Sequence, residues 1–308
     1  MIKASNLTKH YGSLTAVDDL SFEVTKGEVL GFLGPNGAGK TTTMRMLAGF
    51  VRPTSGDAGI NGHSVLTEPV EAKRCIGYLP EGAPAYGEMR PPEFLKFVAA
   101  VRGIHGKAAQ QAISQASDKL ELGSVAEQPI ETLSKGFKRR VGLAQAILHD
   151  PSVLILDEPT DGLDPNQKHE VRRLINELAA NKTIVVSTHI LEEVDAVCTR
   201  AMIVAHGKIV ADDTPRNLTA RSRYHNAVSL RLSAPAQLDE VAAALTELPD
   251  VASIETDAAT LTVTAFPAGS AGILNPVSSL ASERSWPVEH VELEAGRLDE
   301  VFRELTRK

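Results

Sequence analysis

Residues 29–42 read Val-Leu-Gly-Phe-Leu-Gly-Pro-Asn-Gly-Ala-Gly-Lys-Thr-Thr. The first five form an apolar run that predicts a buried strand, and residues 43–48 have helical character. Between them lies the spacing Gly-x4-Gly-Lys-Thr, whose glycines let the backbone curl so that successive N–H groups face an anion. Strand, glycine loop and helix in that order favour a phosphate-binding loop over an ordinary glycine turn.

This loop predicts how a nucleoside triphosphate and Mg²⁺ would be bound. Lys40 is expected to reach the outer phosphates, Thr41 to ligate the metal, and the start of the following helix to add positive charge. The predicted nucleotide-binding residues of the loop are Gly34, Pro35, Asn36, Gly37, Ala38, Gly39, Lys40, Thr41 and Thr42.

A second apolar run, 153–156, is followed by two carboxylates. Asp157 ends the predicted strand, where a carboxylate can hold Mg²⁺, and Glu158 can polarise an attacking water as general base. Without the loop, this pair would more simply be an exposed turn. His189 follows a third predicted strand, 183–187, and could contact the terminal phosphate, although a lone histidine is more often structural.

The order of elements predicts a parallel α/β sheet. Helical patterns cover residues 91–122, a helix that starts at Ser134 and ends before Asp150-Pro151, and residues 168–180. Strand patterns at 2–7 and 20–24 precede the loop, and a hairpin is expected over 201–211.

The tail from Tyr224 has a different organisation. Strands are predicted at 228–232, 251–254, 260–264 and 288–291, and helices at 238–248, 273–281 and 298–305. The order βαββαβ plus a helix fits a small ferredoxin-like α+β domain. We therefore expect two domains, residues 1–221 and residues 222–308.

Composition limits the classes of function. The 308 residues carry a net charge of −7, so no global basic field is available to bind nucleic acid. The two cysteines are isolated from each other, which fits a reducing compartment. The longest uncharged stretch, 258–282, contains two prolines and two glycines and is not a membrane span. A membrane function would need spans from another chain.

Residues 1–221 resemble the ATP-binding cassette (ABC) family, because several motifs occur in the family's order. Tyr11 resembles the aromatic residue that stacks on adenine, and residues 34–42 are similar to the Walker A motif. Leu133-Ser134-Lys135-Gly136-Phe137 resembles the signature, residues 153–158 the Walker B strand with its catalytic glutamate, 160–164 the D-loop and His189 the switch histidine.

The resemblance implies an ATPase that works in pairs. In this family Ser134 and Gly136, at a helix N-terminus, close on ATP bound to the other subunit. A homodimer or a related second cassette is therefore expected. The resemblance also implies a separate transmembrane permease, whose coupling helix meets a helical subdomain at about 82–150, and a cytoplasmic location on the inner face of the cell membrane.

Two departures from the family pattern bear on the type of cassette. Lys135 and Phe137 replace Gly and Gln in the signature, while Ser134 and Gly136 remain. Glu81 stands where a Gln usually contacts Mg²⁺ and the attacking water, and its carboxylate can still offer an oxygen ligand. These features resemble ABC-2 exporters, including the gliding-motility group, and predict an ATPase subunit of such an exporter.

Other interpretations remain open at this stage. Glu81 and the altered signature allow a non-catalytic or regulatory nucleotide-binding subunit. A soluble ABC protein acting on ribosomes or DNA is disfavoured by the single cassette and the lack of a basic stripe. The acidic tail could be a structural appendage or a ligand sensor. The transported substrate cannot be read, because substrate contacts would lie in the permease.

Overall fold

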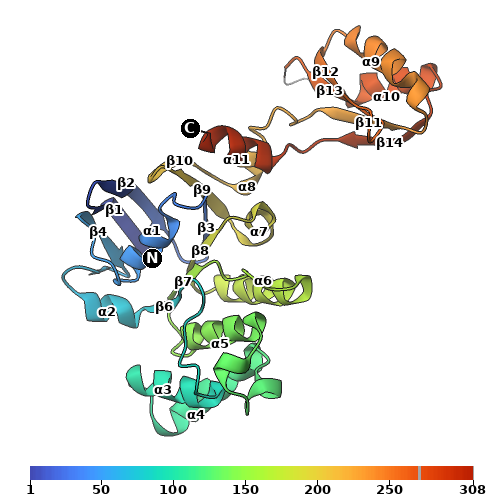
Figure 1. Ribbon diagram of the computed structural model, residues 1–308. Coiled ribbons are helices and arrows are strands. Elements are labelled where there is room, and N and C mark those ends of the chain that lie inside the picture. Colours follow the sequence, from blue (N-terminus) through green and yellow to red (C-terminus); the bar gives the residue numbers. More distant parts are fainter. Residues whose placement is uncertain (270–271, 308) are drawn as a thin grey trace. The chain divides into compact units, whose positions relative to one another are not determined.

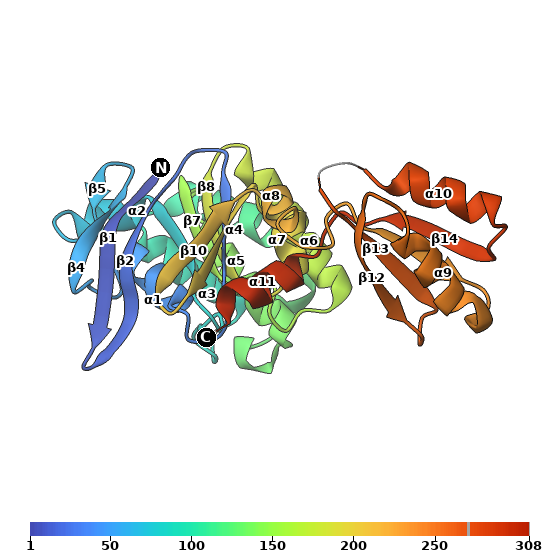
Figure 2. The same ribbon diagram turned by 90° about the horizontal axis from the view of Figure 1, so that it is seen from above.

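A computed structural model describes residues 1–269 and 272–307 (Figures 1 and 2). The chain divides into two compact units. The first comprises Met1–Pro215 together with the residues from Leu305 onward, and the second comprises Arg216–Glu304. Each unit has its own sheet or sheets and its own apolar core. Among the described residues, no helix combines the length and apolar character needed to cross a bilayer.

A six-stranded sheet organises the first unit. Its strand order is β10-β9-β3-β8-β7-β6, with β10 antiparallel to β9 and the other neighbours parallel. The strands are β3 (Val29–Leu33), β6 (Ile76–Leu79), β7 (Val153–Asp157), β8 (Thr183–Thr188), β9 (Arg200–Ala205) and β10 (Lys208–Asp213). Every residue of β3, β6, β7 and β8 is buried, as expected for parallel strands covered on both faces.

A second sheet of the same unit is antiparallel, in the order β2-β1-β4-β5. Its strands are β1 (Ile2–Tyr11), β2 (Leu14–Val24), β4 (Ser55–Ile60) and β5 (His63–Ser64). The sequence patterns gave only parts of β1 and β2 and missed β4, whose Gly56, Asp57 and Gly59 are weak strand formers. The two sheets share one core, in which the rings of Phe22 and Phe32 pack edge to face with their centroids 5.1 Å apart.

The helices of this unit surround the sheets. They are α1 (Lys40–Leu47), α2 (Pro69–Arg74), α3 (Pro91–Val101), α4 (Gly106–Lys119), α5 (Lys135–Ile147), α6 (Pro165–Ala179) and α7 (Leu191–Val197). Helix α8 (Pro215–Thr219) begins at the last residue of this unit and continues into the second. The helical patterns predicted over 91–122, the second of them over 108–120, correspond to α3 and α4, which are separated at Gly103, whose φ of 75° suits a left-handed turn. Figure 1 shows α3, α4 and α5 gathered together.

The second unit is a βαββαβ fold, as predicted. Its elements are β11 (Val228–Leu232), α9 (Leu238–Thr246), β12 (Val251–Asp257), β13 (Thr262–Pro267), α10 (Leu274–Glu283) and β14 (Val288–Leu293), followed by α11 (Leu298–Thr306). The antiparallel strand order is β12-β13-β11-β14. Helices α9 and α10 bury their apolar sides against one face of this sheet, around Leu230 and Val263. The ferredoxin-like α+β prediction is therefore confirmed.

Candidate functional site

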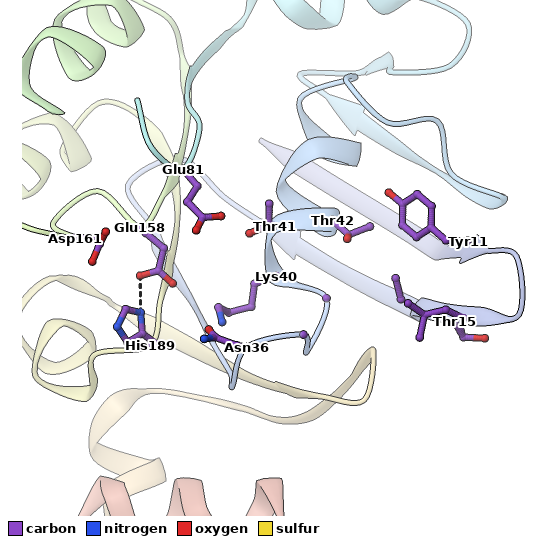
Figure 3. Close-up of a pocket in the computed structure, with 14 residues that line it drawn as sticks. Tyr11, Thr15, Asn36, Lys40, Thr41, Thr42, Glu81, Glu158, Asp161 and His189 are labelled. Atoms are coloured by element: carbon purple, nitrogen blue, oxygen red, sulfur yellow. Dashed lines mark hydrogen bonds and ion pairs between the residues drawn. The ribbon is translucent and has the colours of Figure 1, made fainter. Parts of the chain in front are cut away.

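A cleft of 540 Å³ lies at the carboxyl ends of the parallel strands (Figure 3). Strands β3, β7 and β8 are parallel neighbours, so the loops that follow them meet at one edge of the sheet. Ten predicted site residues line the cleft: Tyr11, Asn36, Gly37, Gly39, Lys40, Thr41, Thr42, Glu81, Glu158 and His189. Leu14, Thr15, Ala16 and Asp161 line it as well.

The glycine loop is held too tightly for larger residues. A Cβ at Gly34 would lie 2.4 Å from the carbonyl oxygen of Val204, and one at Gly39 would lie 2.4 Å from that of Ala16. Gly39 also has a φ of 103°, which favours glycine. The close packing therefore requires glycine at positions 34 and 39 of the loop.

Lys40 is held by its own loop. Its side chain is buried, and Nζ donates hydrogen bonds to the carbonyl oxygens of Gly34 (2.7 Å) and Pro35 (3.2 Å). Burial lowers the pKa of Lys40, while the nearby carboxylates Glu158, Asp157 and Glu81 act against that shift. The ammonium therefore faces the cleft from a fixed position, as an anion cradle requires.

Asp157 provides a buried carboxylate beside the loop. It is 0% exposed, and its Oδ1 accepts hydrogen bonds from Ser187 Oγ (2.5 Å) and Thr41 Oγ1 (3.4 Å). Its Oδ2 is also buried and has no hydrogen-bond partner among the described residues. A buried, unpartnered carboxylate oxygen is costly, and a hard cation would satisfy it. The oxygen atoms of Asp157, Thr41 and the exposed, cleft-lining Glu81 thus fit Mg²⁺.

Glu158 and His189 form a direct contact from neighbouring loops (Figure 3). Glu158 Oε2 lies 2.8 Å from His189 Nδ1, and the two side chains are 12% and 49% exposed. Burial raises the pKa of Glu158, opposed by His189 and Lys40. The backbone of Glu158 has a φ of 51°, and its N–H donates to Ser187 Oγ at 3.0 Å. This carboxylate is therefore largely shielded from water and is held in place by His189 and by its own backbone hydrogen bond.

Tyr11 is the last residue of β1, in the antiparallel sheet, beyond the strand pattern predicted over residues 2–7. Its ring is 48% exposed, and Lys9 Nζ sits 5.1 Å from the ring centroid. Figure 3 shows Tyr11 on the opposite side of Lys40 from Glu158. Leu14, Thr15 and Ala16, at the start of β2, line the cleft as well, and sequence patterns gave no signal for them because they carry no motif.

The signature residues are not among those that line this cleft. Ser134 is exposed at the start of α5, where its Oγ accepts a hydrogen bond from the Phe137 N–H at 3.3 Å. Gly136 is buried, and a Cβ there would lie 2.3 Å from Gln167 Oε1. The cleft of one chain is therefore lined by the phosphate loop, Glu81 and Glu158 but not by the signature.

These features define a nucleotide-binding α/β protein of the phosphate-loop class. A glycine loop opens a helix, a lysine faces the cleft, and a buried aspartate and a partly buried glutamate stand side by side at the end of β7. Such a site can bind a nucleoside triphosphate and activate water toward its terminal phosphate.

Comparison with known proteins agrees with this class. The ABC transporter family profile matches residues 17–161. The bacitracin transport ATP-binding protein BcrA of Bacillus licheniformis is 41% identical over 227 residues, covering 73% of each chain. A solved structure described as the ATP-binding subunit of an ABC transporter has a TM-score of 0.66 and 29% identity, over 72% of this chain and 92% of that one.

The chain belongs to the ABC transporter family. The prediction of an ATP-binding cassette and of an ATPase is confirmed at the level of that family. A further relative, the probable multidrug ABC transporter ATP-binding protein YbhF of Escherichia coli, is 38% identical over 72% of this chain. This chain spans only 38% of that relative's length.

Proposed function

We propose that this chain binds and hydrolyses ATP to power an ABC-2 type exporter through a separate transmembrane permease, working at the cytoplasmic face of the cell membrane. The observation that carries the proposal is the Glu158–His189 pair, set in the same cleft as Lys40. The resemblance to exporter cassettes and the E. coli relative, whose name describes a multidrug transporter, support the exporter type.

The phosphates would be bound by residues 34–42. Backbone N–H groups and the N-terminus of α1 supply the anion site, and Lys40 would exchange its loop carbonyl partners for the outer phosphate oxygens. Tyr11, half exposed at the far end of the cleft, would stack on the adenine ring. These contacts would direct the terminal phosphate toward Glu158.

Thr41, Asp157 and Glu81 would hold Mg²⁺, which when bound neutralises charge on the phosphate oxygens. The unpartnered Oδ2 of Asp157 supports this assignment. Glu158 would take a proton from the attacking water, since its raised pKa makes it a better base than an ordinary glutamate. His189 would orient Glu158 and contact the terminal phosphate.

A second copy of the chain would complete the site. Ser134 is exposed at the N-terminus of α5, outside the cleft of its own chain, so its hydroxyl is available to another chain's nucleotide. We assign the cassette to residues 1–221 and an accessory domain to residues 222–308. The division between compact units after Pro215 supports a boundary in this region.

The permease would dock in an apolar groove of 890 Å³ on the cassette. Its lining includes four exposed apolar side chains, Phe50 (68% exposed), Val70 (61%), Phe97 (42%) and Val101 (70%). Exposed apolar surface of this kind marks interaction sites. Tyr78 and Pro80, just before Glu81, line the same groove, so a docked coupling helix would lie next to the catalytic loop. The acidic net charge gives no support to nucleic acid as a partner.

The test is a complementation experiment with two variants. Glu158→Gln removes the base of its own chain, and Ser134→Ala removes the signature hydroxyl offered to the partner. Each variant alone is expected to show little ATP hydrolysis. A mixture should regain activity, because mixed dimers contain one site with an intact base and an intact signature.

The concentration dependence of the unmodified chain supplies the control. Its rate per chain should rise with protein concentration if two chains build each site. Full activity of Ser134→Ala alone would contradict the two-chain site. Complete absence of turnover in the unmodified chain, with ATP still bound, would favour a non-catalytic subunit.

A further inference from the structure

A buried carboxylate in α7 lies between the loops that carry Glu158 and His189. Glu193 is only 4% exposed, although it belongs to the first turn of a short surface helix. A carboxylate out of water is unfavourable unless it is paired or hydrogen-bonded. Its hydrogen-bond partners therefore indicate why it is there.

Each oxygen of Glu193 accepts a hydrogen bond from a different loop. Oε1 accepts from the hydroxyl of Thr160, and Oε2 accepts from that of Thr188 at 2.7 Å. Both threonines are buried, at 2% and 0% exposure. Thr160 lies two residues after Glu158, and Thr188 immediately precedes His189. One carboxylate thus joins the two chain segments that present the catalytic pair.

The segment around Glu158 needs such support. Strand β7 ends at Asp157, and Glu158 adopts a φ of 51°, in the left-handed region that non-glycine residues rarely occupy. A strained residue persists only where its surroundings over-determine it. The Glu158 N–H is fixed by Ser187, and the Thr160–Glu193 hydrogen bond fixes the chain two residues further on.

The other segment is fixed by the same threonine hydroxyl that contacts Glu193. Thr188 Oγ1 donates to Glu193 and accepts a hydrogen bond from the Ile190 N–H at 3.0 Å. The residue between them, His189, is therefore held on both sides, with its Nδ1 at 2.8 Å from Glu158. Movement of either segment would lengthen that contact.

We propose that Glu193 is a positioning residue for ATP hydrolysis, which clamps Thr160 and Thr188 so that Glu158 and His189 stay in contact. The inference rests on the proposed function, because it takes Glu158 as the base. Glu193 itself does not line the cleft and touches no reacting group.

The chain offers a matched control for the loss of a buried hydroxyl. Thr183 is on β8, the strand that also carries Thr188, and is 1% exposed, but its Oγ1 has no hydrogen-bond partner among the described residues. Thr183→Val and Thr160→Val remove the same atom type from equally buried positions. Only the second breaks the clamp.

The experiment compares kcat and KM for ATP, together with the melting temperature, in Thr160→Val, Thr183→Val, Glu193→Ala and Glu193→Gln. Thr160→Val should lower kcat about ten- to a hundred-fold with KM nearly unchanged, since misplaced catalytic groups cost rate rather than binding. Thr183→Val should match the unmodified chain. Glu193→Gln should retain most activity that Glu193→Ala loses, because the Thr160 hydroxyl can turn and accept from the amide.

A kcat for Thr160→Val equal to that of the unmodified chain would overturn the inference and leave the proposed function intact. Losses of kcat that follow the melting temperature across all four variants would also overturn it, since Glu193 would then act on stability alone. Absence of turnover in the unmodified chain would overturn the proposed function and this inference together.

Discussion

The two units of this chain place their charged side chains in opposite ways. In the parallel sheet, every residue of β3 and β7 up to Asp157 is buried, and the charges gather in the loops just beyond the strand ends. In the C-terminal sheet, β12 and β14 carry exposed charges along the strands themselves, such as Glu255 and Glu292.

Topology explains this difference. Parallel neighbours end at the same edge, so loops far apart in sequence converge there, as Lys40, Glu158 and His189 do. Antiparallel neighbours end at opposite edges, so their loops disperse. In the second unit, helices pack against one face of the sheet, while the strands also carry charged side chains that form ion pairs, such as Glu255 with Arg223 (N···O 2.6 Å). From this difference we expect the catalytic residues to lie in the first unit and the second unit to fold independently of it.

The largest effect is expected from a substitution at the carboxyl ends of the parallel strands. Glu158→Gln should lower ATP turnover more than about a hundred-fold, because the amide cannot accept the proton of the attacking water. ATP affinity should be preserved, since Lys40 and the glycine loop are untouched. A phosphate-release assay tests the loss of turnover, and an equilibrium binding measurement tests the preserved ATP affinity. Turnover that survives would show that the base lies elsewhere.

Lys40→Ala should act on binding instead. Removal of a charged hydrogen-bond donor from the phosphates costs about 1.5–3 kcal/mol, or roughly ten- to a hundred-fold in Kd. Titration with a fluorescent ATP analogue measures it. Arg45→Ala, on the same helix but outside the cleft, is the control. An unchanged Kd for Lys40→Ala would show that Lys40 does not bind the phosphates.

The pH dependence of hydrolysis should give a smaller effect. Burial raises the pKa of Glu158, and only the carboxylate can act as base, so kcat/KM should fall as pH drops through that raised pKa. The acid limb should therefore lie at higher pH than an ordinary glutamate would give. A pH–rate profile with circular dichroism at each pH separates this from unfolding. An acid limb at the pH expected for an exposed glutamate would contradict this prediction.

The smallest effect on ATP hydrolysis is expected from the core of the second unit. Leu230 is 0% exposed in β11, and Leu230→Ala should destabilise that unit by about 2–5 kcal/mol. ATP turnover at a temperature below the new transition should stay unchanged. Calorimetry and ATPase assays check this, with Leu293→Ala, at an exposed strand position, as the control. A loss of turnover parallel to unfolding would mean that the units are energetically coupled.

Sequence reasoning succeeded wherever a local pattern carries the physics. The βαββαβ order of the tail was predicted almost element by element, because alternating strands and amphipathic helices leave a periodic signal. It failed at β4, where Ser55–Ile60 pairs with β1 despite weak strand residues, since the register with residues 2–8 supplies the stability.

The sequence alone pointed to the phosphate loop, to Asp157 and Glu158 at the end of β7, to His189 after β8 and to the family, because short motifs with fixed spacing fix local backbone geometry. Only the tertiary structure decided what those residues face. It brought Glu158 within 2.8 Å of His189, left Asp157 Oδ2 buried without a described partner, and joined Thr160 to Thr188 through Glu193. These contacts link positions about thirty residues apart, and their distances follow from strand order and packing, which no local pattern specifies.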